Sequence, residues 1–169
     1  MVEHLWAGWR IPYTGATGGP ALERPPGQTL FEGILASDLP DDETFIVRRG
    51  ERCFAILNAF PYCSGHLMVL PNRGVLGLTD LDADEYRELW DMVRDSVVAV
   101  ETAYTPDGVN VGANLGKGAG AGVPDHLHVH VLPRWIGDTN FTTAIADVRV
   151  LPETLAASWL RICEAWPVA

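Results

Sequence analysis

Histidine alternates with aliphatic residues between positions 126 and 131, and this alternation constrains the fold more than any other feature of the chain. The histidines are His126, His128 and His130, and leucine and valine stand between them. Successive side chains of a β-strand point to opposite faces of its sheet, so a period of two predicts a strand. One face of that strand carries three imidazoles, and the other face packs into a hydrophobic core.

Three neighbouring imidazoles with no acidic residue among them suit a negatively charged group such as a phosphate. An imidazole has an unperturbed pKa of about 6.5, so it can be neutral near pH 7 and act as a nucleophile. In this interpretation His128 attacks phosphorus while its other ring nitrogen binds a backbone carbonyl. His126 and His130 then position the phosphate oxygens and offset their charge. A zinc site and a set of buried, hydrogen-bonded histidines are the alternatives.

The length and composition are typical of one globular domain with its own core. The chain has 169 residues, of which 47% are hydrophobic and 20% charged. A net charge of −10 argues against nonspecific binding of a nucleic-acid polymer, although a small nucleotide needs only a local pocket. No apolar run reaches the ~18 residues of a membrane span. Because the three cysteines form no close pair, we expect a cytoplasmic protein with reduced thiols.

Hydrophobic patterns predict an α+β fold built on an antiparallel sheet. The clearest helix spans 79–104, with acidic residues at its start and an apolar stripe at three- and four-residue steps. A closing helix is expected over 152–166, with Pro152 near its first turn. Short connections between strands favour antiparallel pairing. The expected strands are 45–49, 52–58, 66–70, 109–113 and the histidine segment.

The whole chain, 1–169, is expected to form a single domain with three parts. Residues 1–28 contain several prolines and glycines and predict an irregular arm, anchored by Trp6 and Trp9. Residues 29–150 form the core, which is expected to begin with a short strand or turn over 29–36. Residues 151–169 carry the C-terminal helix.

The histidine segment, followed at once by Val-Leu-Pro-Arg at 131–134, resembles the signature of the histidine-triad (HIT) nucleotide-binding superfamily. The resemblance covers roughly residues 29–150. It implies a five-stranded antiparallel sheet with one long helix and one C-terminal helix, and a homodimer formed by joining two sheets. It also implies an enzyme in which His128 attacks the α-phosphorus of a nucleotide and forms a nucleotidyl-histidine intermediate.

Two further residues match the pattern of the family. Asn58 stands where relatives place a short polar residue on the ribose hydroxyls, and an amide can both donate to and accept from a diol. His66 matches the histidine that completes a cluster of four around the phosphate. Without the resemblance, Asn58 would simply end one strand and His66 would begin the next.

A glycine-rich loop, residues 116–122, comes just before the histidine strand. Small residues allow several backbone N–H groups to approach phosphate oxygens. Many hydrolases of the family have glutamine and then serine or threonine after the glycine here, whereas this chain has no hydroxyl at that place. We therefore expect backbone N–H groups near Gly120 and Gly122 to bind phosphate, together with Asn114 and Lys117.

Apolar side chains are expected to cover the base of the nucleotide. Phe31 and Ile56 are the candidates, with Leu30 beside them. Trp135 ends the histidine strand, and it is the tryptophan that we expect to touch the base, because indole offers a large flat surface.

Four segments are similar to the bacterial diadenosine tetraphosphate phosphorylase branch of the family: 5–10, 119–124, 134–141 and 146–152. The similarity implies a nucleotide substrate with inorganic phosphate as the second acceptor, and ADP and ATP as products. One alternative is a hydrolase or phosphoramidase that releases AMP, and another is a biosynthetic nucleotidyl transferase acting on an unusual nucleotide. A nucleotide sensor without turnover is the third, and the intact His128 argues against it.

The zinc site that many relatives carry is not expected in this chain. Those relatives hold a structural zinc with Cys-x-x-Cys, a histidine that follows an arginine, and the first histidine of the triad. Here Thr29 and Glu32 stand at the cysteine positions, and Arg73 is followed by Gly74. The resemblance therefore predicts a protein without a metal, and we expect no other cofactor.

Overall fold

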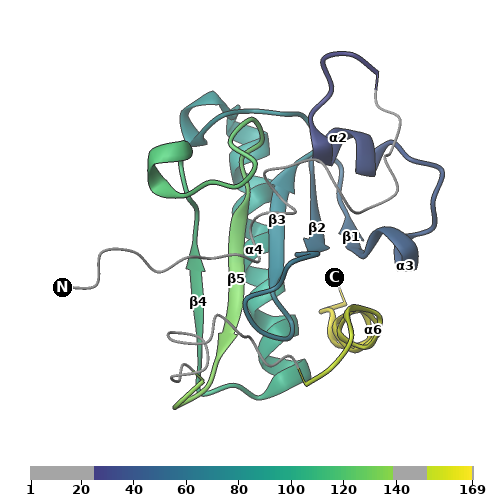
Figure 1. The fold of residues 1–169 in the computed structure, drawn as a ribbon, viewed down its shortest axis with the longest axis vertical. Helices are drawn as coiled ribbons and strands as arrows, with labels where there is room; N and C mark the ends of the chain where they lie inside the picture. Colours follow the sequence, from purple (N-terminus) through teal and green to yellow (C-terminus); the bar gives the residue numbers. More distant parts are fainter. Residues whose placement is uncertain (1–24, 139–151, 169) are drawn as a thin grey trace.

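A computed structural model describes residues 25–138 and 152–168, and its centre is an open five-stranded antiparallel sheet (Figure 1). The strand order is β1-β2-β3-β5-β4. The strands are β1 (Ile46–Arg49), β2 (Cys53–Leu57), β3 (Leu67–Pro71), β4 (Gly108–Gly112) and β5 (Val129–Arg134). This arrangement confirms the predicted α+β fold with its five strands.

The histidine strand enters the middle of the sheet between two strands that precede it in the chain. β5 pairs with β3 on one side and with β4 on the other. In this register Met68 lies opposite His130, and Leu67 lies opposite Val131. β5 begins only at Val129, so His126 and His128 lie in the segment just before the strand, with a bend at His126. The central position brings residues 58–66 close to the histidines.

The long helix α4 (Ala83–Tyr104) and the C-terminal helix α6 (Leu155–Ala165) are both present, as predicted. The side chain of Asp82 caps α4 by accepting from the backbone N–H groups of Asp84 and Glu85, and Glu85 completes a capping box. This cap explains why the helix begins four residues later than its predicted start at Thr79. A short 3₁₀ turn, η2 (Leu78–Asp80), precedes the helix.

The sheet separates two hydrophobic clusters. The larger one lies between the sheet and α4, with α6 beside it, and includes Val69, Val129, Leu89 and Ile162. The smaller one lies on the opposite face and includes Phe31, Ile56 and Met68, among others. Helix α2 (Leu30–Leu35) packs on that opposite face through Phe31, Ile34 and Leu35.

Residues 29–36 form helix α2, so the prediction of a short strand or turn there was wrong. Thr29 accepts from the backbone N–H of Glu32, and the Glu32 carboxylate accepts from the backbone N–H of Thr29. This capping box starts a helix in a segment too short to show helical periodicity. A further short helix, α3 (Asp41–Thr44), was not anticipated.

The C-terminal helix starts at Leu155, with Thr154 as its N-cap, so Pro152 lies before the cap rather than in the first turn. The expected arm at 1–28 lies almost entirely outside the described residues, as do 139–141 and 146–151 of the branch-specific segments. Within the described ranges, no helix has both the length and the apolar character needed to cross a membrane.

Candidate active site

The histidine segment presents two faces, as its alternation predicts. Leu127, Val129 and Val131 belong to the core under α4. The three histidines occupy the other face, and each is at least nine-tenths buried. Buried imidazoles need hydrogen-bond partners, and these partners define which nitrogen of each ring carries a proton.

His128 has the arrangement of a nucleophile. Its Nδ1 lies 2.8 Å from the backbone carbonyl oxygen of His126, which can only accept, so Nδ1 carries the proton. Nε2 is therefore left with its lone pair, and the His128 side chain lines a cavity. Burial lowers the pKa of His128, which keeps the ring neutral near pH 7. A neutral ring held through Nδ1 can attack phosphorus through Nε2.

His130 is oriented from its other side by a chain of hydrogen bonds that begins at a backbone amide. The N–H of Tyr62 donates to His66 Nδ1 at 3.1 Å. His66 Nε2 therefore carries the proton and donates to His130 Nδ1 at 2.9 Å. The remaining nitrogen of a neutral His130, Nε2, is then a donor. The rings of His128 and His130 lie 4.9 Å apart and nearly perpendicular, and both line the same cavity.

His126 is bonded at both ring nitrogens and does not line the cavity. Its Nε2 lies 2.9 Å from the carbonyl oxygen of Pro71, and its Nδ1 lies 2.7 Å from Thr29 Oγ1. Burial lowers its pKa, so Nε2–H donates to the carbonyl and Nδ1 accepts from the threonine. The expectation that His126 positions phosphate oxygens is corrected, because no ring nitrogen is left for a ligand.

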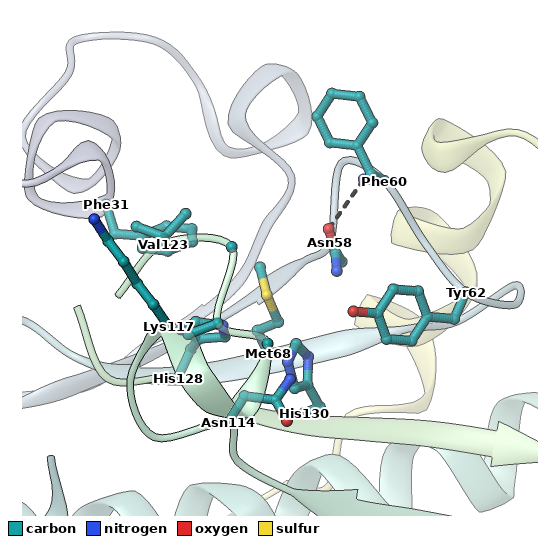
Figure 2. A pocket seen from close by; sticks show the side chains of 13 residues that line it. Phe31, Asn58, Phe60, Tyr62, Met68, Asn114, Lys117, Val123, His128 and His130 are labelled. Atoms are coloured by element: carbon teal, nitrogen blue, oxygen red, sulfur yellow. Dashed lines mark hydrogen bonds between the residues drawn. The ribbon is translucent and has the colours of Figure 1, made fainter. Parts of the chain in front are cut away.

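Figure 2 shows the cavity above His128 and His130, with Phe31, Lys117 and Val123 toward one side and Phe60 and Tyr62 toward the other. Eight residues predicted from the sequence line it, and they come from α2, the residue after β2, the segment after β4, the glycine loop, and the histidine segment at the start of β5. These are Phe31, Asn58, Asn114, Lys117, Gly120, Gly122, His128 and His130.

Asn58 follows directly after β2 and is buried at the cavity. Its Oδ1 accepts from the backbone N–H of Phe60 at 3.0 Å, which fixes the orientation of the amide. Its Nδ2 lies 3.4 Å from His66 Nδ1. The Asn58 side chain therefore contacts both the loop after β2 and His66, and it lines the cavity.

The glycine loop contributes one positive charge and a bent backbone. Lys117 lines the cavity within a 3₁₀ turn, η3 (Lys117–Ala119). Gly120 has φ +91°, a conformation that side chains with a Cβ rarely adopt. Its N–H donates to the carbonyl of Lys117 at 3.0 Å, so that amide is not available to a phosphate as expected. The role of Gly120 is therefore to turn the loop.

Three residues predicted to cover the base, Leu30, Ile56 and Trp135, do not line the cavity. Ile56 is buried beneath it, in the same cluster as Phe31 and Met68. Trp135 lies just beyond the far end of β5, where its ring meets that of Tyr104 edge-on at 6.2 Å. The expectation that Trp135 touches the base in this cavity is corrected. Trp135 is close to the histidines in sequence but not in space, because the two ends of the six-residue strand β5 lie about 20 Å apart.

Five lining residues were missed: Phe60, Tyr62, Met68, Ala121 and Val123. Met68 could have been found, because it shares a strand face with His66 at a spacing of two. Nothing in the sequence pattern marks Tyr62 as a site residue. The fold of the β2–β3 loop, which no periodicity reveals, places its ring 4.6 Å from that of His66.

The residues at the positions of the family's zinc ligands do not fit a metal ion. Glu32 accepts from two backbone N–H groups, His126 Nδ1 accepts from Thr29, and Gly74 has no side chain. A Cβ at Gly74 would lie only 2.5 Å from Thr29 Cγ2, so a ligating side chain has no room there. Elsewhere in 25–138 and 152–168, no group of three or more His, Cys, Asp or Glu residues could hold a metal.

Comparison with known proteins gives the class to which this fold and site belong. The family model described as "HIT domain" matches residues 40–135, more than half of the chain. The chain belongs to the HIT family, and it is an enzyme of that family.

Among curated relatives, the chain is 36% identical over 169 residues to a protein of Mycobacterium tuberculosis named AP-4-A phosphorylase. The match covers 98% of this chain and 85% of the relative. A Schizosaccharomyces pombe protein named asymmetrical bis(5'-nucleosyl)-tetraphosphatase is 38% identical over 80 residues. That match covers 47% of this chain and 43% of the relative.

Solved structures give the same fold. A protein of Sulfolobus tokodaii described as a hypothetical histidine triad nucleotide-binding protein is 28% identical, with a TM-score of 0.65. It aligns with 80% of this chain and 89% of its own. A zinc-bound histidine triad family protein of Mycobacterium smegmatis is 26% identical, also with a TM-score of 0.65. It aligns with 81% of this chain and 91% of its own.

Proposed function

We propose that this enzyme cleaves diadenosine tetraphosphate, or a closely related dinucleotide, at an α-phosphorus and passes the nucleotidyl group to inorganic phosphate. The observation that carries the proposal is the contact of His128 Nδ1 with the backbone carbonyl of His126, which leaves Nε2 as the nucleophilic nitrogen of a ring that lines the cavity. The similarity to the Mycobacterium tuberculosis phosphorylase, which spans nearly the whole chain, supports the substrate and the acceptor.

In the first half-reaction, His128 Nε2 attacks the α-phosphorus. A bond forms between nitrogen and phosphorus, and the bond from phosphorus to the bridging oxygen of the β-phosphate breaks. The electron pair leaves with that oxygen, so ATP departs and AMP stays on His128. The Nε2–H of His130 donates toward a phosphate oxygen, and Lys117 offsets part of the negative charge.

In the second half-reaction, an oxygen of inorganic phosphate attacks the same phosphorus. The bond from phosphorus to His128 breaks, the electron pair returns to Nε2, and ADP is released. The sum is diadenosine tetraphosphate plus phosphate giving ADP plus ATP. If water took the place of phosphate, AMP would be released instead.

The polar part of the cavity is expected to bind the sugar of the nucleotide, and the apolar part is expected to bind the base. We assign the ribose to Asn58, whose amide is held at the cavity edge. Phe31, Met68 and Val123 line the apolar part and are assigned to the base. Flat aromatic and aliphatic side chains bind a base through burial of its faces.

We also propose that the enzyme forms a homodimer. β4 pairs with β5 and stands at the edge of the sheet in the described part of the chain, with Val111 43% exposed on it. An edge strand with an exposed apolar side chain is a template for pairing with a second copy. Sedimentation equilibrium of the full chain tests this, and replacement of Val111 by aspartate is expected to favour the monomer.

We also place the enzyme in the cytoplasm, as the cysteine usage suggests. Burial raises the pKa of Cys53 to about 12 and that of Cys163 to about 11. Thiols with raised pKa values have little thiolate near pH 7 and react slowly. Fractionation of cells that produce the protein tests this assignment.

The decisive experiment is turnover of diadenosine tetraphosphate with and without inorganic phosphate, followed by product separation. ADP and ATP that appear only with phosphate support the phosphorylase. AMP at the same rate in both conditions supports the hydrolase instead, as the similarity to the Schizosaccharomyces pombe enzyme over half of the chain would allow.

A further inference from the structure

The hydrogen bonds around His126 form a closed network with the start of helix α2. Thr29 Oγ1 donates to His126 Nδ1 at 2.7 Å and accepts from the backbone N–H of Glu32 at 3.2 Å. The Glu32 carboxylate accepts from the N–H of Gly74 at 2.8 Å and from that of Thr29 at 2.7 Å. Three segments that are far apart in the sequence are thereby joined.

The hydrogen-bonding role of each side chain in the network, as donor or acceptor, is fixed by its partners. The N–H groups of Gly74 and Thr29 lower the pKa of Glu32, which therefore remains an acceptor-only carboxylate. Thr29 and His126 are buried, so neither can exchange its partner for water without opening the structure. Because the carbonyl of Pro71 requires a donor at His126 Nε2, Nδ1 has to accept, and a hydroxyl supplies the proton.

We propose that Thr29 and Glu32 are positioning residues for the nucleophile, which hold His126, and through it His128, without a metal ion. The connection to His128 is the backbone carbonyl of His126, which lies 2.8 Å from His128 Nδ1. A second connection is Phe31, two residues after Thr29. Its ring lies 5.4 Å from that of His126 and 6.0 Å from that of His128.

The network uses the positions at which the family resemblance places zinc ligands. The Mycobacterium smegmatis relative is described as zinc-bound. In this chain the same positions supply a hydroxyl, a carboxylate and a bare backbone N–H, all engaged with one another. A metal ion would have to break these bonds and would still lack a ligand at Gly74. The link between helix α2 and the histidine segment is therefore made by these hydrogen bonds and by the ring contacts of Phe31.

The variants that test the proposal are Thr29→Val and Thr29→Ser. Valine keeps the shape of threonine and removes the hydroxyl, whereas serine keeps the hydroxyl. Thr154→Val is the matched control, because Thr154 Oγ1 caps α6 by accepting from Ala157 N and takes no part in the site. All three are compared with the unchanged chain by thermal unfolding, so that loss of a helix cap is separated from loss of positioning.

The first readout is the long-range ¹H–¹⁵N spectrum of the imidazoles, which reports which nitrogen carries the proton and does not depend on any assumed substrate. In the unchanged chain His126 is expected as the Nε2–H form with a hydrogen-bonded Nδ1. Thr29→Val should shift the Nδ1 resonance of His126, while Thr29→Ser and Thr154→Val should not. An unshifted His126 in Thr29→Val overturns the proposal.

The second readout is the kinetics of turnover, and this arm rests on the proposed function. Thr29→Val should lower kcat about tenfold with little change in KM, as is typical when a partner that orients a functional imidazole is lost. Thr29→Ser should restore kcat. Equal losses in the valine and serine variants, or a loss only in KM, overturn the proposal. Absence of turnover in the unchanged chain counts against the function, whereas the spectra still test the positioning.

Glu32→Gln gives an independent check if Thr29→Val fails to fold. Glutamine has one oxygen where Glu32 uses two, so one of the backbone N–H groups loses its acceptor. A shift of the His126 resonance in the same direction as in Thr29→Val, but smaller, is expected. An unchanged spectrum contradicts the role of Glu32.

Metal content provides the last arm. Protein dialysed against a chelator should keep its kcat and its His126 resonances, and added zinc should not bind at one ion per chain. Stoichiometric zinc that restores a lost activity would show that a metal, rather than the network, holds His126.

Discussion

His126 and His130 flank the nucleophile symmetrically in the sequence, yet their surroundings differ completely. His126 is bonded to Thr29 and Pro71 at both ring nitrogens and lies outside the cavity lining. His130 is bonded to His66 at one nitrogen and lines the cavity. Two equal spacings thus give one histidine bonded to the surrounding structure at both ring nitrogens and one that lines the cavity. Identical residue types on one strand face need not share a role.

Removal of the nucleophile should have the largest effect, because both sides of the comparison act through it. His128→Ala is expected to lower kcat by about a thousandfold or more and to leave nucleotide binding largely intact, since only the covalent step is lost. Single-turnover kinetics and binding of a non-hydrolysable analogue measure the two separately. Turnover at the normal rate by this variant would exclude the proposed mechanism.

The pair His130→Ala and His126→Ala tests the difference directly. His130→Ala should lower kcat by about a hundredfold, the usual contribution of a positioned proton donor, with a small effect on unfolding. His126→Ala should destabilise the fold by about 1–3 kcal/mol, because it leaves two buried partners unsatisfied. Urea unfolding and kcat are measured for both. If His126→Ala proved stable but inactive while His130→Ala proved unstable but active, the roles would be reversed.

Asn58→Ala should weaken nucleotide binding by about 1–2 kcal/mol, which corresponds to one or two lost hydrogen bonds. Since Asn58 also bonds the N–H of Phe60, part of the loss comes from the loop after β2. Isothermal titration with a nucleotide and with its 2'-deoxy analogue separates the two parts. The variant should lose the preference for the ribose, and an unaltered preference would place the sugar elsewhere.

The smallest expected effect is a change in the acid limb of the pH profile. Burial lowers the pKa of His128, so the neutral nucleophile should persist below pH 6.5, and kcat should fall only as the pH passes through the lowered value. The same shift means that the unfolded chain binds more protons than the folded one. Stability contributed by His126 and His128 is therefore present above about pH 6.5 and declines as the pH falls below it. If kcat already fell as the pH was lowered from 8 to 7, the lowered pKa of His128 would be contradicted.

Much of the fold could be predicted because it depends on periodicity. Alternation at 126–131 and the apolar stripe of α4 report directly which face each side chain presents to the core. Helix α2 could not be read this way, because six residues hold fewer than two turns and the signal lies in its cap at Thr29 and Glu32. The start of α6 was also misplaced, because the signal for it again lies in a cap: Thr154, and not the preceding Pro152, is the N-cap.

By itself the sequence determined the two alternating faces at 126–131, the family, and His128 as the candidate nucleophile, because local spacing and residue type are sufficient for each. Only the tertiary structure decided which flanking histidine lines the cavity and that Trp135 lies away from it. It also decided that Thr29, Glu32 and Gly74 belong to one network. Hydrogen-bond partners from α2, the β2–β3 loop and the end of β3 make these distinctions, and such partners are brought together by packing rather than by sequence spacing.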